Sequence, residues 1–154
     1  MKRSSVLRFV VVACLSALPV GLSAAGLSEP MVVAKGDWAA SKMTEFLIVW
    51  RSAYIVDNPG KPTPACASAS YDTQGNVIIV DILGANPQIE NAKAGIDFWW
   101  GVIQENFLPN FSHRTGIGFS ANDVTIIYWQ RNASGGPKEI VRRQKGEYTL
   151  PHNQ

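Results

Sequence analysis

The sequence predicts an α+β domain in which a four-stranded, mainly antiparallel sheet carries one long helix across a face. The predicted order is helix, strand, strand, helix, strand, strand. Residues 87–107 place apolar side chains at three- and four-residue steps, as an amphipathic helix does. Residues 66–83 and 123–148 each hold two β-forming runs around a short turn, which is typical of hairpins. Hairpins that alternate with helices favour an α+β layer structure.

The long helix is expected to start at Pro87 and to end at Phe107. Asn86 is a good cap residue, and proline suits the first helical position because it has no N–H to lose. Pro109 disfavours helical geometry at the residue before it. The apolar stripe predicts a helix buried against the sheet, and a second interpretation makes it the wall of a ligand pocket as well. Its members are Ile89, Ala92, Ile96, Trp99, Trp100, Ile103 and Phe107.

A first helix is predicted to begin after an Asp37 cap and to run to about Ala53. Residues 46–50 are apolar on every side, so a strand is the alternative there. Residues 26–35 show no clear periodicity, and we expect them to wrap the surface or fray.

The first hairpin is predicted to pair residues 66–71 with residues 77–83. Gly75 and Asn76 in the turn tolerate positive φ. The second strand, VIIVDIL, is apolar on both faces except for Asp81. This composition predicts a central strand that is covered on both sides.

The second hairpin is predicted to pair residues 123–132 with residues 138–148. In one register Arg131 would face Lys138, and in the other, with a five-residue loop, it would face Glu139. Because opposite charges attract across strands, the five-residue loop is the favoured register.

Residues 1–25 have the pattern of a secretory signal peptide, and residues 26–154 are expected to form a single domain. The start is basic, an apolar run follows, and small residues precede Gly26. The alternative is a lipoprotein signal in which Cys14 would be the acylated first residue. Since no later stretch is long and apolar enough to span a bilayer, we expect a periplasmic or secreted protein without a transmembrane span in its mature form.

Removal of the signal peptide changes the charge balance. The whole chain has 14 Lys and Arg against 12 Asp and Glu. Lys2, Arg3 and Arg8 lie in the signal, which contains no acidic residue, so 11 basic residues remain against 12 acidic ones, a balance of −1. The basic character that suggests nucleic acid as a partner therefore belongs to the signal, and we expect no nucleic-acid binding.

Cys66 is the only cysteine left after cleavage, so no disulfide forms within the mature chain. We expect Cys66 to be buried, with pairing between chains or catalysis as the alternatives. A catalytic thiol needs a base, and His113 is the only histidine outside the C-terminal tail. Nothing in the sequence brings the two residues together.

The sequence contains no common motif for metal, phosphate or dinucleotide binding and no nucleophile elbow. No cofactor, metal ligand or catalytic residue is assigned. A carboxylate pair of Asp81 with Asp97 or Glu105 would suit glycoside hydrolysis if a cleft held the two groups a few Å apart. The simpler interpretation places Asp97 on the polar side of the helix and Asp81 in a strand.

The candidate binding residues lie in the last hairpin and in the loop 109–122, because long loops without structure are often functional. Arginine beside aromatic residues is typical of binding hot spots, and the simpler interpretation is a solvated outer strand. Because strand residues alternate, two adjacent arginines face opposite ways and at most one controls binding. The candidates are Trp129, Arg131, Arg142, Arg143 and His113.

These observations favour a non-enzymatic exported domain that binds another protein or an envelope component, such as an envelope assembly factor or an inhibitor of a foreign enzyme. The alternative is a small periplasmic hydrolase or small-ligand-binding protein with its pocket between the helix 87–107 and the sheet. A deep cleft around Trp99, Trp100 and Asp81 would favour the alternative, and an exposed patch on the last hairpin would favour the binding domain.

Overall fold

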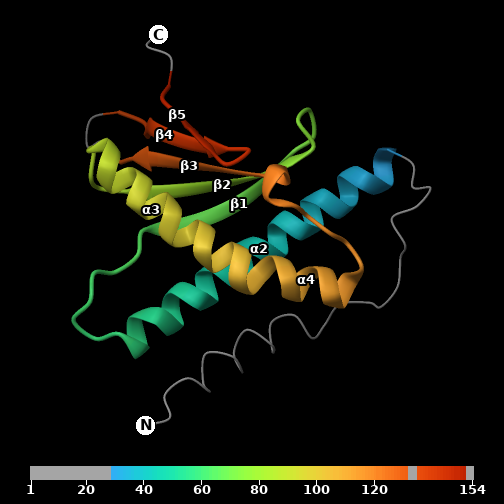
Figure 1. Cartoon of the computed structure of the whole chain (residues 1–154), viewed down its shortest axis with the longest axis horizontal. Helices are drawn as coiled ribbons and strands as arrows, with labels where there is room; N and C mark the ends of the chain where they lie inside the picture. Colours follow the sequence, from blue (N-terminus) through green and yellow to red (C-terminus); the bar gives the residue numbers. More distant parts are fainter. Residues whose placement is uncertain (1–28, 132–134, 152–154) are drawn as a thin grey trace.

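The computed structural model describes residues 29–131 and 135–151, with side chains from Lys35 onward. The expected signal peptide and its lipoprotein alternative at Cys14 lie outside the described residues. The described chain forms one five-stranded sheet with helices packed beside it (Figure 1), which confirms the α+β class. None of the helices in this part of the chain is both long enough and apolar enough to cross a membrane.

The sheet has five strands in the spatial order β1-β2-β3-β4-β5, one more than predicted. Three of the four strand pairings are antiparallel, as expected, and β2 with β3 is parallel. The parallel pair arises because the helical connection carries the chain back before β3 begins. The strands are β1 (Cys66–Asp72), β2 (Val77–Gly84), β3 (Val124–Gln130), β4 (Lys138–Gln144) and β5 (Glu147–Thr149).

The fifth strand exists because a two-residue turn interrupts the strand predicted over 138–148. Lys145 and Gly146 have φ values of 49° and 84°. Two successive residues with positive φ are the feature of the tight hairpin turn whose twist matches the flanking strands. Lysine rarely adopts such a φ, so the local pattern resembled a continuous strand. In the first hairpin Asn76, with φ 51°, adopts the positive φ that its residue type allows.

The register favoured for the last hairpin is wrong. Glu139 pairs with Trp129 rather than with Arg131, Tyr128 pairs with Val141, and a bulge separates the two pairs. Arg131 instead donates its backbone N–H to the carbonyl of Gly84 at 3.0 Å. Tyr128 and Val141 are both buried. Burial of apolar side chains therefore sets the register, because it outweighs an exposed charge pair.

The first helix, α2, is longer than predicted and spans Glu29–Asp57. Its helical backbone includes most of the segment 26–35 that was expected to lack structure, and the strand alternative over 46–50 is wrong. Thr44 fixes α2 to the edge of the sheet: its hydroxyl donates to the Ala69 carbonyl at 3.0 Å and accepts from the Ala69 N–H at 2.8 Å. The helix thus covers part of an edge strand whose backbone groups would otherwise lack partners.

The long helix continues past its predicted end. It consists of α3 (Ile89–Val102), a π-helical turn (Ile103–Phe107) and α4 (Leu108–Thr115). Pro109 lies in the first turn of α4, where a missing N–H costs little, and the wider turn before it lets Leu108 donate its N–H to the carbonyl of Ile103. The helix ends at Gly116, whose φ of 69° is left-handed.

The predicted functional loop over 109–122 is accordingly much shorter. Residues 109–115 are helical, and a short 3-10 turn, Ala121–Asp123, precedes β3. The start of α3 also differs slightly from the prediction, since Gln88 rather than Asn86 is its N-cap residue.

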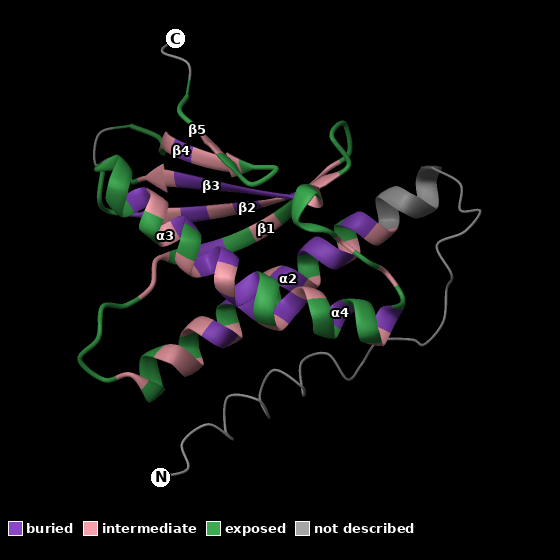
Figure 2. Cartoon of the chain, in the orientation of Figure 1, coloured by how far each residue is buried: buried purple, intermediate pink, exposed green. Residues whose placement is uncertain are grey.

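The described helices lie on one face of the sheet, with α3 across β2, β3 and β4 and α2 beside β1 (Figures 1 and 2). This confirms the predicted burial of the apolar stripe except at Ile89, which begins α3 and is exposed. The two helices contact each other through aromatic pairs, with ring centroids 5.7 Å apart for Trp50 and Trp99 and 5.4 Å apart for Phe46 and Phe107.

The strand β2 is central but covered on one side only, which corrects the expected cover on both sides. Its residues alternate between buried and partly exposed along the whole strand. Ile78, Val80 and Ile82 belong to the core with the helices. The alternate residues face the other side, where no described helix packs against the sheet. We call this side the outer face.

Candidate functional site

The strand registers define two rows of side chains on the outer face. One row runs across β1, β2, β3 and β4 as Cys66, Leu83, Trp129 and Glu139. The next runs as Ser68, Asp81, Ile127 and Arg142. Side chains from residues far apart in the sequence therefore meet here, because each row crosses the parallel β2 and β3 pair.

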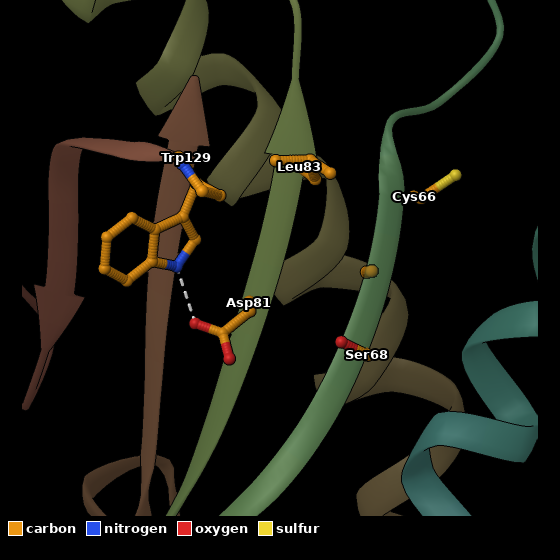
Figure 3. Close-up of a pocket in the computed structure, with 7 residues that line it drawn as sticks. Cys66, Ser68, Asp81, Leu83 and Trp129 are labelled. Carbon is orange, nitrogen blue, oxygen red and sulfur yellow. Dashed lines mark hydrogen bonds between the residues drawn. The ribbon is translucent and has the colours of Figure 1, made fainter. Parts of the chain in front are cut away.

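An open pocket of about 530 Å³ lies on this face. That volume falls within the range of small-molecule sites, about 300–1,000 Å³. In Figure 3 Trp129 and Asp81 face each other across β3 and β2, and the sulfur of Cys66 points away from Asp81. The lining residues are Cys66, Ala67, Ser68, Asp81, Leu83, Trp129 and Pro137.

The indole N–H of Trp129 donates a hydrogen bond of 2.6 Å to Oδ1 of Asp81 (Figure 3). The two residues are diagonal neighbours, because Asp81 pairs with Ile127 and Trp129 lies two residues further along β3. A hydrogen bond to a carboxylate is stronger than one between neutral groups. The bond fixes the orientation of the indole ring and uses one of the two carboxylate oxygens.

Arg142 lies on the outer face and is held by Glu139. Its Nε and Nη2 donate to the two carboxylate oxygens of Glu139 at 2.7 and 2.6 Å. This hydrogen bonding raises the pKa of Arg142, against a smaller opposing effect of burial. The bulge beside Tyr128 places the two side chains on the same face. The pair is electrically neutral, so Arg142 adds little positive charge to the outer face.

Arg143 lies on the opposite face, as alternation predicted. Its guanidinium is 4.5 Å from the ring centroid of Trp100 on α3. Tyr148, which pairs with Arg143, donates its hydroxyl to Asp97 on the same helix. Burial and then the Asp97 hydrogen bond raise the pKa of Tyr148 far above its ordinary value. These contacts fasten β4 and β5 to α3.

The structure does not bring the other sequence-predicted residues to the pocket. His113 is exposed on α4, and Arg131 is exposed just after β3. Of the five candidates, Trp129 lines the pocket and Arg142 shares its face. The carboxylates of Asp81 and Asp97 lie on opposite sides of the sheet, so they do not form the pair that glycoside hydrolysis needs.

Two features of the site were missed from the sequence. Cys66 was expected to be buried and is exposed, because it stands at the start of an edge strand on the outer face. The sequence suggests for Asp81 either an acid or an ordinary strand residue, and the structure makes it the charged group among the described residues that line the pocket. Its signal was the single charge inside an apolar strand.

The polar groups of the pocket are Cys66, Ser68 and Asp81. Asp81 is hydrogen-bonded to Trp129, and neither Ser68 nor Cys66 has a hydrogen-bonded base that would activate it within the described chain. No group of three or more potential metal ligands is found among the described residues. The arrangement offers an apolar wall from Leu83 and Trp129 beside one carboxylate.

Comparison with known proteins does not add to this description. No protein-family model, curated protein or solved structure matches the chain.

Proposed function

We propose that the protein is an exported, non-enzymatic binding domain whose binding site is the pocket around Trp129 on the outer face. The observation that carries the proposal is a partly exposed tryptophan held in one orientation by Asp81, inside an open pocket on a sheet face that no described helix covers. Export is proposed from the signal pattern of residues 1–25.

The composition of the outer face supports binding to another protein or to an envelope component. Tryptophan and arginine are enriched at the energetic centres of interfaces, and a polar rim commonly surrounds an apolar centre. Here Trp129 and Leu83 provide the apolar centre, and the Arg142–Glu139 pair lies beside it. Ile127, between Asp81 and Arg142 in the register, is only 5% exposed, so its neighbours already exclude water from the centre of this face.

The interface between α3 and the sheet is filled with side chains. Ile96 and Trp99 are 0% and 1% exposed there. The hydrolase or ligand carrier with a pocket at that interface gains no support from these residues. The binding domain is therefore the function that we propose.

The test is capture of partners from an envelope extract by the exported protein and by matched variants. Trp129→Ala should reduce capture of specific partners at least tenfold, because it removes the aromatic wall of the pocket. His113→Ala, an exposed change on the helical side, is the control and should leave capture unchanged. Circular dichroism of each variant checks that the fold is retained. Equal capture by the wild type and a folded Trp129→Ala variant would overturn the proposal.

A further inference from the structure

We propose that the pocket around Trp129 recognises a protonated primary amine on an apolar stem, with the ammonium group on Asp81 and the stem against Leu83 and Trp129. This inference rests on the proposed function, since it names the ligand chemistry of the same site. The shared chemistry is an alkylammonium group, whether it is the side chain of a lysine in a partner or a free alkylamine.

The negative charge of the pocket favours a cationic ligand. Asp81 receives the indole N–H of Trp129, which is a neutral donor and does not compensate a negative charge. No Lys or Arg of the described residues forms an ion pair with Asp81. Arg142 lies in the same row as Asp81, but β3 separates the two residues. The guanidinium of Arg142 is hydrogen-bonded to Glu139. The pocket therefore holds an uncompensated carboxylate that favours a cation and repels an anion.

The hydrogen-bond acceptors of the pocket favour a ligand that is a hydrogen-bond donor. An ammonium group has three N–H donors, and a carboxylate accepts about four hydrogen bonds through its two oxygens. Oδ1 of Asp81 accepts the indole N–H of Trp129, and Oδ2 accepts no hydrogen bond from the described residues. Ser68 lies directly opposite Asp81 on β1, and its hydroxyl is a second acceptor at the same level of the sheet. The site thus offers acceptors to a group that consists of donors.

The apolar wall of the pocket favours a ligand with an alkyl chain. Leu83 and the Trp129 ring line the pocket beside the carboxylate, so an alkyl chain of four to six carbons, about 5–8 Å long, has apolar surface to cover. A quaternary ammonium ion has no N–H donor, and its recognition needs several aromatic faces. Trp129 is the single aromatic among the described residues that line the pocket. The geometry therefore favours a primary over a quaternary ammonium group.

The experiment is a titration of the full chain at pH 7, followed by the indole N–H resonance of Trp129 in NMR spectra and by calorimetry. The probes are n-hexylamine, n-hexanol and hexanoate, which share a stem and differ in charge. Hexylammonium should give saturable shifts, hexanol should bind at least tenfold more weakly, and hexanoate should not bind. Equal binding of hexanol and hexylammonium would overturn the ammonium proposal.

Two variants with the same charge change separate the pocket from the general field of the protein. Asp81→Asn keeps a side-chain oxygen that accepts the indole N–H and removes the charge, so binding of hexylammonium should fall at least tenfold. Glu147→Gln is the matched control, because Glu147 lies exposed on the outer face of β5. It should leave binding unchanged. An equal loss in both variants, or no loss in Asp81→Asn, would overturn the proposal.

A further pair of probes separates the two sources of the amine. The probes are Nα-acetyl-lysine methylamide and its norleucine analogue, which lacks the amine. If the lysine compound binds at least as tightly as hexylamine and the norleucine compound does not bind, the natural ligand is a lysine side chain of a partner. If hexylamine binds and the lysine compound does not, the natural ligand is a free alkylamine. If no amine binds, while Trp129→Ala still abolishes partner capture, the ammonium chemistry fails and the proposed binding function stands. If partner capture is unaffected as well, both proposals fail.

Discussion

The guanidinium of Arg143 lies over the ring of Trp100, 4.5 Å from its centroid, and this contact joins β4 to α3. Its neighbour in the sequence, Arg142, points to the other side of the sheet and is held by Glu139. Two adjacent arginines therefore have different roles. Arg143 stabilises the packing of a helix on the sheet, and Arg142 belongs to the surface that we propose for binding.

Arg143→Ala should destabilise the fold by about 1 kcal/mol, since a cation over a tryptophan ring contributes about 0.5–2 kcal/mol depending on its exposure. Urea unfolding of Arg143→Ala, Trp100→Phe and the double variant measures the coupling between the two side chains. Additive changes would show that the contact contributes nothing. Partner capture should be the same for wild type and Arg143→Ala.

Trp99→Ala should destabilise the fold by about 3–5 kcal/mol, from lost transfer free energy and the cavity that remains. Trp99 is 1% exposed, contacts Trp50, and donates its indole N–H to the Ala65 carbonyl at 3.1 Å. The urea midpoint measures the change, with exposed His113→Ala as control. A shift as small as that of the control would mean that α3 does not pack as described.

Thr44→Val should destabilise the fold by about 1–3 kcal/mol, because it leaves the N–H and carbonyl of Ala69 without the hydroxyl that bonds both. Thr44→Ser keeps the hydroxyl and should retain most of the stability. Amide hydrogen exchange at Ala69 should accelerate in the valine variant and remain slow in the serine variant. Equal exchange in the two variants would contradict the edge contact.

Stability should fall at alkaline pH because the pKa of Tyr148 is raised in the folded state, by burial first and by Asp97 second. The neutral phenol is favoured by folding, so its contribution is complete below the unfolded pKa of about 10 and is lost as pH rises toward the higher folded pKa. Tyr148→Phe should flatten this part of the stability curve. Urea unfolding between about pH 9 and 11 measures it, and identical slopes in both proteins would exclude Tyr148 as the cause.

N-terminal sequencing of the exported protein should find Gly26 as the first residue. The prediction follows from the basic start, apolar run and small residues that precede this position. An acylated Cys14 at the N-terminus would instead show a lipoprotein anchored to a membrane.

The candidate site was only partly predictable from sequence. Trp129 was identified because it stands near arginines in a strand. Its partner Asp81 lies 48 residues earlier, and local patterns do not reveal that β2 and β3 are parallel neighbours. The two adjacent candidate arginines of the last hairpin, Arg142 and Arg143, lie on opposite faces of the sheet. The alternation of strand residues predicts this division. The hydrogen bonds from Arg142 to Glu139 depend on a bulge that the sequence does not predict.

The sequence by itself determined the α+β class, the first hairpin, the burial of the apolar stripe of α3 and the opposite orientations of Arg142 and Arg143. These features follow from periodicity, which acts over neighbouring residues. Tertiary structure decided the rest. A π-helical turn carries the helix past Pro109, and core burial of Tyr128 and Val141 sets the hairpin register. The described helices pack on one side of the sheet, so none of them covers the outer face. Each of these outcomes depends on contacts between distant segments, whose burial outweighs the local preferences that the sequence displays.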